Sequence, residues 1–166
     1  MKTFIIAAIT ADGFIGRDNS HFADWSGGED KKVFVRLTRE AGVMIMGSRT
    51  LATIGRALPG RRTIVYTRNP ASVPIEGVEA TDEPPATLLK RLEEEGAPAV
   101  AICGGASIYD LFLRAKQVDE LYLTITPHLF GKGLSLFTDT LDVSLSLLES
   151  TPLADSSILL HYTVAK

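Results

Sequence analysis

Short apolar runs alternate with longer amphipathic segments along most of this chain. The runs are rich in β-formers and, at this length and between turn residues, favour strands. They predict strands at residues 4–10, 43–46, 62–66, 76–80, 99–103 and 120–127. The segments between them repeat apolar residues at helical spacing or start and stop as helices do. They predict helices at residues 26–41, 50–54, 84–95 and 107–115.

Strands that alternate with helices predict an α/β fold with a mostly parallel central sheet. Residues 145–149 and 158–164 have no helix between them and predict an antiparallel C-terminal edge. Ser26 is expected to cap the first long helix, with Glu29 three residues later, as in a capping box. Gly42 is expected to end that helix.

Composition narrows the class of protein. The chain has 166 residues, 45% of them hydrophobic, and forms one domain's worth of core, so residues 1–166 are taken as a single domain. A net charge of −3 without a basic run argues against nucleic-acid binding. Cys103 is the only cysteine, which excludes an intrachain disulfide and argues against a structural zinc site. The apolar N-terminal stretch is too short to span a membrane, so a cytoplasmic enzyme is expected.

Two glycine-containing turns carry the candidate chemistry. One lies in residues 46–50 and the other in residues 102–109. Each is an apolar strand that ends in small residues and leads into a helix, where backbone N–H groups bind phosphate well. Two such turns in one domain could hold the two ends of a dinucleotide. The alternative is a pair of ordinary strand–helix turns, since many turns contain two adjacent glycines.

Further motifs follow a recognisable order. They are residues 7–9 followed by 12–16, Trp25 followed by Asp30, and residues 46–50 followed by 58–61. Nearly end to end, this order resembles the dihydrofolate reductase fold. Residues 25–30, 118–121 and 126–137 are similar to its sister branch, the reductase domain of bacterial riboflavin deaminase-reductases. The chain lacks the zinc deaminase motifs of those bifunctional proteins. The resemblance implies a stand-alone NADPH-dependent oxidoreductase, with helices on both faces of the sheet in a three-layer fold.

The resemblance also implies roles for individual residues. Asp30 would bind the substrate and help to supply a proton, with Thr124 as its hydrogen-bonding partner. The alternative for Asp30 is that it and Glu29 only favour the helix dipole. The further substrate-binding residues would be Trp25, Phe34 and Arg61. The cofactor-binding residues would be Ala8, Ile15, Gly16, Gly47, Ser48, Arg49, Thr50, Thr67, Arg68, Gly104, Gly105, Ala106, Ser107, Ile108 and Tyr109.

Several of these assignments have alternatives. Thr67 and Arg68 would hold the adenosine 2′-phosphate, which favours NADPH over NADH, but Arg68 also suits a solvated surface. Tyr109 either contacts the cofactor or packs in the core. Ser48 stands where folate reductases carry a basic residue, which weakens the expected grip on the cofactor. Cys103 is expected to be inert packing. No catalytic role is expected for the histidines, which are His21, His128 and His161.

The first candidate reaction is reduction of the ribosyl group of 5-amino-6-(5-phosphoribosylamino)uracil, as in riboflavin biosynthesis. Dihydrofolate reduction, reduction of another substrate and nucleotide binding without turnover are the alternatives, because a fold does not fix a function. The expected partners are a small pyrimidine or pterin substrate, with no nucleic acid, membrane or metal. A homodimer is expected through residues 120–126 or the C-terminal strand pair.

Overall fold

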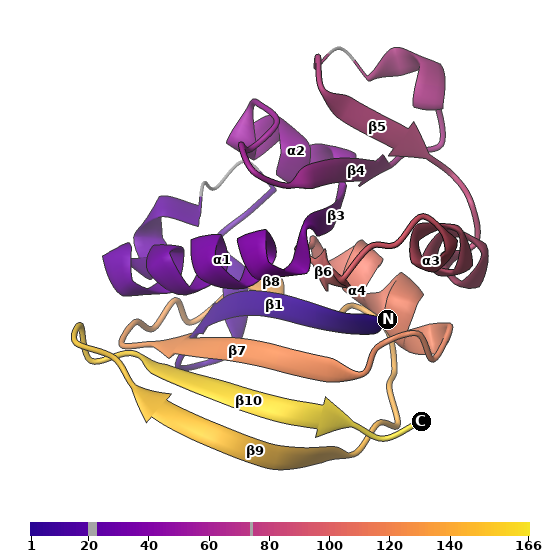
Figure 1. Ribbon diagram of the computed structural model, residues 1–166. Helices are drawn as coiled ribbons and strands as arrows, with labels where there is room; N and C mark the ends of the chain where they lie inside the picture. Colours follow the sequence, from indigo (N-terminus) through magenta and orange to yellow (C-terminus); the bar gives the residue numbers. More distant parts are fainter. Residues whose placement is uncertain (20–22, 74) are drawn as a thin grey trace.

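A central sheet organises the protein (Figure 1). The computed structural model describes residues 1–19, 23–73 and 75–166, and His21 lies outside them. Within these residues, an eight-stranded sheet has the order β5-β4-β3-β6-β1-β7-β10-β9. Its strands are β1 (Lys2–Thr10), β3 (Val43–Gly47), β4 (Arg62–Tyr66), β5 (Val78–Thr81), β6 (Ala99–Ile102), β7 (Glu120–Thr126), β9 (Leu145–Pro152) and β10 (Ile158–Val164).

Strand direction divides the sheet into a parallel part and an antiparallel edge. The neighbours from β5 to β7 all pair in parallel. β10 is antiparallel to β7, and β9 is antiparallel to β10. β1, β7, β10 and β9 run side by side through the lower half of Figure 1. The predicted mostly parallel sheet with an antiparallel C-terminal edge is confirmed.

Helices cover both faces of the sheet. They are α1 (Gly28–Ala41), α2 (Ser48–Ile54), α3 (Pro85–Glu94) and α4 (Ala106–Arg114), with short 3₁₀ turns η1 (Ala23–Ser26) and η2 (Pro70–Ser72). Successive side chains of β1 point to opposite faces. Ile5 and Ala7 pack into the core beneath α3 and α4, whereas Phe4 and Ile6 pack against α1. This alternation produces the predicted three layers.

The start of α1 differs from the prediction. Its N-cap is Gly27, and Ser26 belongs to the preceding 3₁₀ turn, so the proposed capping box is wrong. Gly27 has φ +94°, a conformation that a residue with a side chain rarely adopts. The Ser26 hydroxyl instead donates to Asp30 Oδ2, at 2.8 Å. At the other end, Gly42 closes α1 in a left-handed conformation, as predicted.

A small second sheet was not predicted. β2 (Phe14–Gly16) pairs with β8 (Leu134–Ser135). Both strands are too short for a periodic pattern to reveal them. They join two segments whose sequences suggested a reductase, residues 12–16 and 126–137. None of the helices in the described ranges is long and apolar enough to cross a membrane.

Candidate active site

The two glycine turns meet at the carboxyl end of the parallel sheet, where ligands bind in open α/β sheets. β6 lies between β3 and β1, so the ends of β3 and β6 are neighbours. The Gly47 N–H donates to the Gly104 carbonyl at 2.8 Å, and the Cys103 N–H donates to the Ile45 carbonyl at 2.8 Å. The turns are therefore joined by backbone hydrogen bonds rather than separated by side chains.

Space requires glycine at two positions in these turns, Gly47 and Gly104. A Cβ on Gly104 would lie 2.9 Å from Tyr109 Oη, and Gly104 has φ +106°. A Cβ on Gly47 would lie 3.1 Å from Ile108 Cγ1. A Cβ on Gly105 would lie 3.6 Å from Thr50 Oγ1. The Thr50 hydroxyl of one turn is therefore close to the backbone of the other. The Gly104–Gly105 peptide bond is cis.

The first turn of α4 presents backbone N–H groups. Gly105 is the N-cap and has no side chain to satisfy them. The N–H groups of Ala106 and Ser107 precede the first intrahelical hydrogen bond, and Ser107 is exposed. The side chains of Ile108 and Tyr109 point instead into the core. Tyr109 is only 4% exposed, and its hydroxyl donates to the Ile6 carbonyl at 2.9 Å, so this side chain packs in the core.

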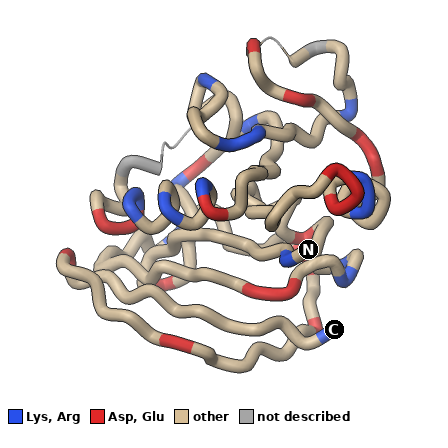
Figure 2. The backbone as a smooth tube through the Cα atoms, viewed as in Figure 1, with Lys and Arg blue, Asp and Glu red and all other residues tan. Residues whose placement is uncertain are grey.

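Two exposed arginines follow the ends of adjacent strands. Gly47, the last residue of β3, pairs with Tyr66, the last residue of the neighbouring strand β4. Arg49 and Arg68 each come two residues after these paired strand ends. Neither guanidinium forms an ion pair with any residue that the structure describes. Figure 2 shows that basic and acidic residues are interspersed elsewhere. Free cations at this edge suit an anionic ligand.

Asp30 lies half-buried in the first turn of α1. Burial raises the pKa of this carboxyl above its usual range. Hydrogen bonds from Ser26 and Thr124 act in the opposite direction, and the negative charge of Asp155 raises the pKa further. Thr124 is 2% exposed and pairs across the sheet with Ala8 of β1. The structure therefore brings Asp30, Thr124 and Ala8 to one place, and Asp30 is suited to retain a proton.

Aromatic residues pack beside this carboxyl. The Trp25 ring meets the rings of Phe130 at 5.1 Å and His128 at 6.0 Å between centroids, both edge to face. His128 and Phe130 were not assigned to the site from the sequence. In the sequence, both residues stand out only as members of the 126–137 motif. That motif does not indicate that this segment packs against Trp25.

A carboxylate attaches the same segment to the loop after β1. Asp12 accepts hydrogen bonds from the Thr10 hydroxyl at 2.6 Å, the Gly131 N–H at 2.7 Å and the Phe130 N–H at 3.2 Å. The Thr10 hydrogen bond is the main cause of the lowered pKa of Asp12. Ile15 and Gly16 follow within this connected loop, in β2.

Arg61 lies along α1 rather than at its first turn. Its Nη1 donates to Thr38 Oγ1 at 2.5 Å and to the Val35 carbonyl at 3.4 Å. With a rise of about 1.5 Å per residue, these contacts lie about 8–12 Å from Asp30 along the helix. Phe34 is half-buried between the two ends. Burial raises the pKa of the Cys103 thiol to about 12, which fits its expected inert role.

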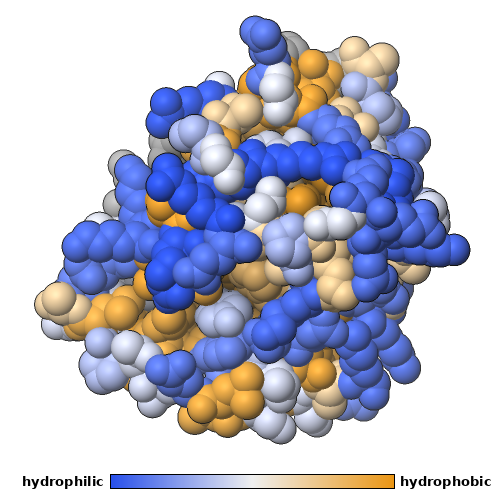
Figure 3. All heavy atoms as spheres, viewed as in Figure 1, coloured by the Kyte–Doolittle hydropathy of each residue, from blue (hydrophilic) through white to orange (hydrophobic). Residues whose placement is uncertain are grey.

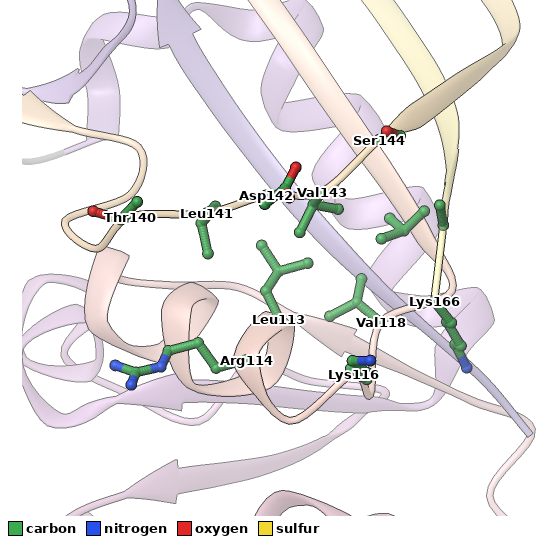
Figure 4. A pocket seen from close by; sticks show the side chains of 12 residues that line it. Leu113, Arg114, Lys116, Val118, Thr140, Leu141, Asp142, Val143, Ser144 and Lys166 are labelled. Atoms are coloured by element: carbon green, nitrogen blue, oxygen red, sulfur yellow. The ribbon is translucent and has the colours of Figure 1, made fainter.

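A cavity of about 420 Å³ lies elsewhere, between the C-terminal end of α4, residues 140–144 and the end of β10 (Figure 4). Val118 lines it just before the amino end of β7, at the sheet edge opposite the glycine turns. Arg114 and Lys166 on its rim already pair with Asp139 and Asp119. This cavity is therefore distinct from the candidate active site.

Comparison with known proteins identifies the family of this chain. The family described as dihydrofolate reductase matches residues 2–143. The chain is 38% identical to dihydrofolate reductase type 3 of Salmonella typhimurium, over 75% of this chain and 71% of that protein. It is 25% identical to the uncharacterized protein YwjB of Bacillus subtilis, over 99% and 98% of the two chains.

Two solved structures share the fold. A protein from Shewanella sp. PV-4 assigned to riboflavin biosynthesis superposes with a TM-score of 0.85 and 21% identity, over 100% of both chains. The Thermotoga maritima deaminase and 5-amino-6-(5-phosphoribosylamino)uracil reductase gives a TM-score of 0.78 at 16% identity, over 99% of this chain and 56% of that one. By the match over most of its length, this chain belongs to the dihydrofolate reductase family.

Proposed function

We propose that the protein is an NADPH-dependent reductase that transfers a hydride to a small pyrimidine-type substrate. The observation that carries this proposal is that two joined glycine turns lie at the carboxyl ends of β3 and β6, while the half-buried carboxyl of Asp30 is hydrogen-bonded to Thr124 near the carboxyl end of β7. NADPH, when bound, supplies the hydride. The residues present fit such a ligand, because the N–H groups of Ala106 and Ser107 precede the first intrahelical hydrogen bond of α4 and the guanidinium groups of Arg49 and Arg68 are exposed, both of which suit phosphate.

The chain's own residues divide the binding work. The N–H groups at the start of α4 would hold the pyrophosphate. Arg49 and Thr50 would contact a phosphate from the other turn. Thr67 and Arg68 would hold the 2′-phosphate, since the planar guanidinium donates to phosphate oxygens in pairs. Ala8, Ile15 and Gly16 would line the nicotinamide, because Ala8 lies in β1 of the sheet and Ile15 and Gly16 lie in β2 of the adjoining loop.

Asp30 would act on the substrate. A carboxyl with a raised pKa can accept a hydrogen bond from a pyrimidine N–H and can also deliver a proton to the reduced product. Thr124 would orient it, Trp25 and Phe34 would contact the ring, and Arg61 would bind an anionic group further along α1. This distribution suits a ring at one end of the substrate and a negative charge at the other.

The preferred substrate is the ribosylaminopyrimidine phosphate of riboflavin biosynthesis. The supporting observation is that a protein assigned to riboflavin biosynthesis shares this fold over 100% of both chains. Dihydrofolate is the alternative, supported by the 38% identity to a dihydrofolate reductase over 75% of this chain. Both substrates combine an amino-substituted pyrimidine ring with an anionic end, so the site residues alone do not separate them.

Loss of the NADPH absorbance tests the proposal, with each candidate substrate added separately. We expect consumption with the ribosylaminopyrimidine phosphate. Consumption with dihydrofolate alone would overturn the preferred substrate, and binding without consumption of NADPH would support a non-catalytic role. Asp30→Asn should abolish turnover while leaving NADPH binding nearly unchanged. Glu29→Gln is the matched control, because Glu29 lies beside Asp30 but pairs outward with Lys32 at 2.8 Å.

We also propose a homodimer, formed by the exposed edge of the sheet. β7 cannot provide that edge, because it is paired with β1 on one side and β10 on the other, so the proposal places the contact on the C-terminal strand pair. β9 is the edge strand at the antiparallel end of the sheet, and its Leu147 and Leu148 are 56% and 54% exposed. Figure 3 shows apolar surface along the lower margin, where Figure 1 places β9. Exposed apolar edge strands tend to pair with another chain.

A further inference from the structure

The hairpin between β9 and β10 reaches the beginning of α1. Asp155, in the turn of this hairpin, has its Oδ2 atom 2.9 Å from the position that a Cβ on Gly27 would occupy. Its Oδ1 atom accepts the Ser157 N–H at 3.1 Å, and the Leu153 N–H donates to the Ser157 carbonyl at 2.8 Å. The hairpin thus holds a second carboxylate against the N-cap of the helix that carries Asp30.

Packing fixes this hairpin in place. Leu159 of β10 is buried in the cluster beneath α1, and Leu153 packs against the same cluster. Ser157 is 3% exposed. Because the turn is closed by hydrogen bonds and anchored on both sides, Asp155 cannot swing far from α1. Gly27 leaves room for it, since any side chain there would displace the carboxylate.

We propose that Asp155 is a positioning residue of the active site: the hairpin holds it against the N-cap of α1, where its negative charge opposes ionisation of Asp30, the proposed proton donor. This inference rests on the proposed function of Asp30. Asp155 does not itself contact the substrate in this account. It acts through Asp30, because a negative charge close to this carboxyl makes loss of the Asp30 proton less favourable.

The groups around Asp30 leave this role to Asp155. From η1 and β7, the neighbours are the hydroxyls of Ser26 and Thr124, which hydrogen-bond the carboxylate and favour its ionised form. Tyr109 is buried, and the nearby Asp30 contributes to the raised pKa of its hydroxyl, so Tyr109 adds no charge. Among the described side chains that shift the pKa of Asp30, Asp155 is the charged one. On α1 itself, the nearest carboxylate, Glu29, is paired with Lys32. The hairpin therefore supplies the charge that opposes the two hydroxyls.

Asp155→Asn tests the proposal, because asparagine keeps the shape and the acceptor for the Ser157 N–H but removes the charge. Removing a neighbouring negative charge makes Asp30 easier to ionise, so its pKa falls. The protonated form then disappears at lower pH. We expect the alkaline limb of the kcat profile to move to lower pH, with the plateau at low pH unchanged. Asp155→Glu, which keeps the charge, should restore the limb toward its wild-type position.

Glu149→Gln is the matched control. Glu149 lies on β9 of the same hairpin, is exposed, and loses the same charge on substitution. It should leave the profile where it is. Equal shifts in Asp155→Asn and Glu149→Gln would show a general charge effect and overturn the proposal, as would an unchanged profile in Asp155→Asn.

A second measurement separates this proposal from the proposed function. The carboxyl carbon of Asp30 can be titrated by NMR in protein without substrate. A lower midpoint in Asp155→Asn, with no change in Glu149→Gln, supports the coupling whether or not a substrate has been found. The coupling together with no turnover of any candidate substrate would refute the role of Asp30 in the reaction. An unchanged Asp30 midpoint in Asp155→Asn would refute the coupling itself.

Discussion

Gly104→Ala is the most informative single change in the glycine turns. The new methyl group would lie 2.9 Å from Tyr109 Oη and 3.1 Å from Tyr109 Cζ. Tyr109 cannot move aside easily, because its ring is buried and its hydroxyl is bonded to the Ile6 carbonyl. Gly104 also has φ +106°, which an alanine rarely adopts.

The two effects allow an estimate of the cost. A non-glycine residue in a left-handed conformation costs about 1–2 kcal/mol. Overpacking of a filled core costs about 1–3 kcal/mol. Together they predict a loss of about 2–5 kcal/mol, with more if the Tyr109 hydroxyl is displaced from its acceptor. For a chain of this size, each kcal/mol lowers Tm by about 2–4 °C, so a fall of about 10 °C is expected.

Urea unfolding and thermal melting measure this loss, and Gly96→Ala is the matched control. Gly96 also has a positive φ, +82°, but a Cβ there would meet nothing within 4 Å. The control therefore contains the backbone cost without the steric one and should lose only about 1–2 kcal/mol. Equal unfolding midpoints for Gly104→Ala and Gly96→Ala would refute the packing argument. NADPH binding should weaken in Gly104→Ala alone.

Three further predictions concern charge and surface. Burial works against ionisation of Glu120, but hydrogen bonds from Lys2 and His161 hold the pKa of this carboxyl below its usual range. The ionised Glu120 therefore stabilises the folded state, and this stabilisation is lost as the pH falls through the lowered pKa. The unfolding free energy of Glu120→Gln should therefore change less than that of the wild type between about pH 5 and pH 3. Arg68→Gln should weaken binding of NADPH about tenfold without changing that of NADH, as titration by fluorescence would show; equal losses for both cofactors would contradict the 2′-phosphate assignment. Leu147→Lys should convert the proposed dimer to a monomer in light scattering, and an unchanged mass would exclude β9 as the interface.

The periodic features of the fold could be predicted from the sequence. Apolar runs and helical repeats located β4 at residues 62–66 and ended α1 at Gly42, as the structure shows. These features depend on neighbours within one or two turns of chain, which a sequence displays directly. The two glycine turns were visible for the same reason. Ser26 shows the limit, because the capping pattern does not distinguish an N-cap from the end of a 3₁₀ turn, where the Ser26 hydroxyl donates to Asp30 four residues later.

Tertiary structure alone decided which distant segments complete the site. The sequence indicated Asp30, but it did not reveal that residues 126–137 would pack on Trp25 or that Asp155 would stand at the beginning of α1. Such contacts join segments far apart in the chain, and they depend on strand order and hairpin placement rather than on local pattern. The sequence therefore determines the glycine turns and the identity of the candidate carboxyl, Asp30. The electrostatic surroundings of Asp30 are decided only by tertiary structure, because they include Asp155 of the C-terminal hairpin that packs against α1.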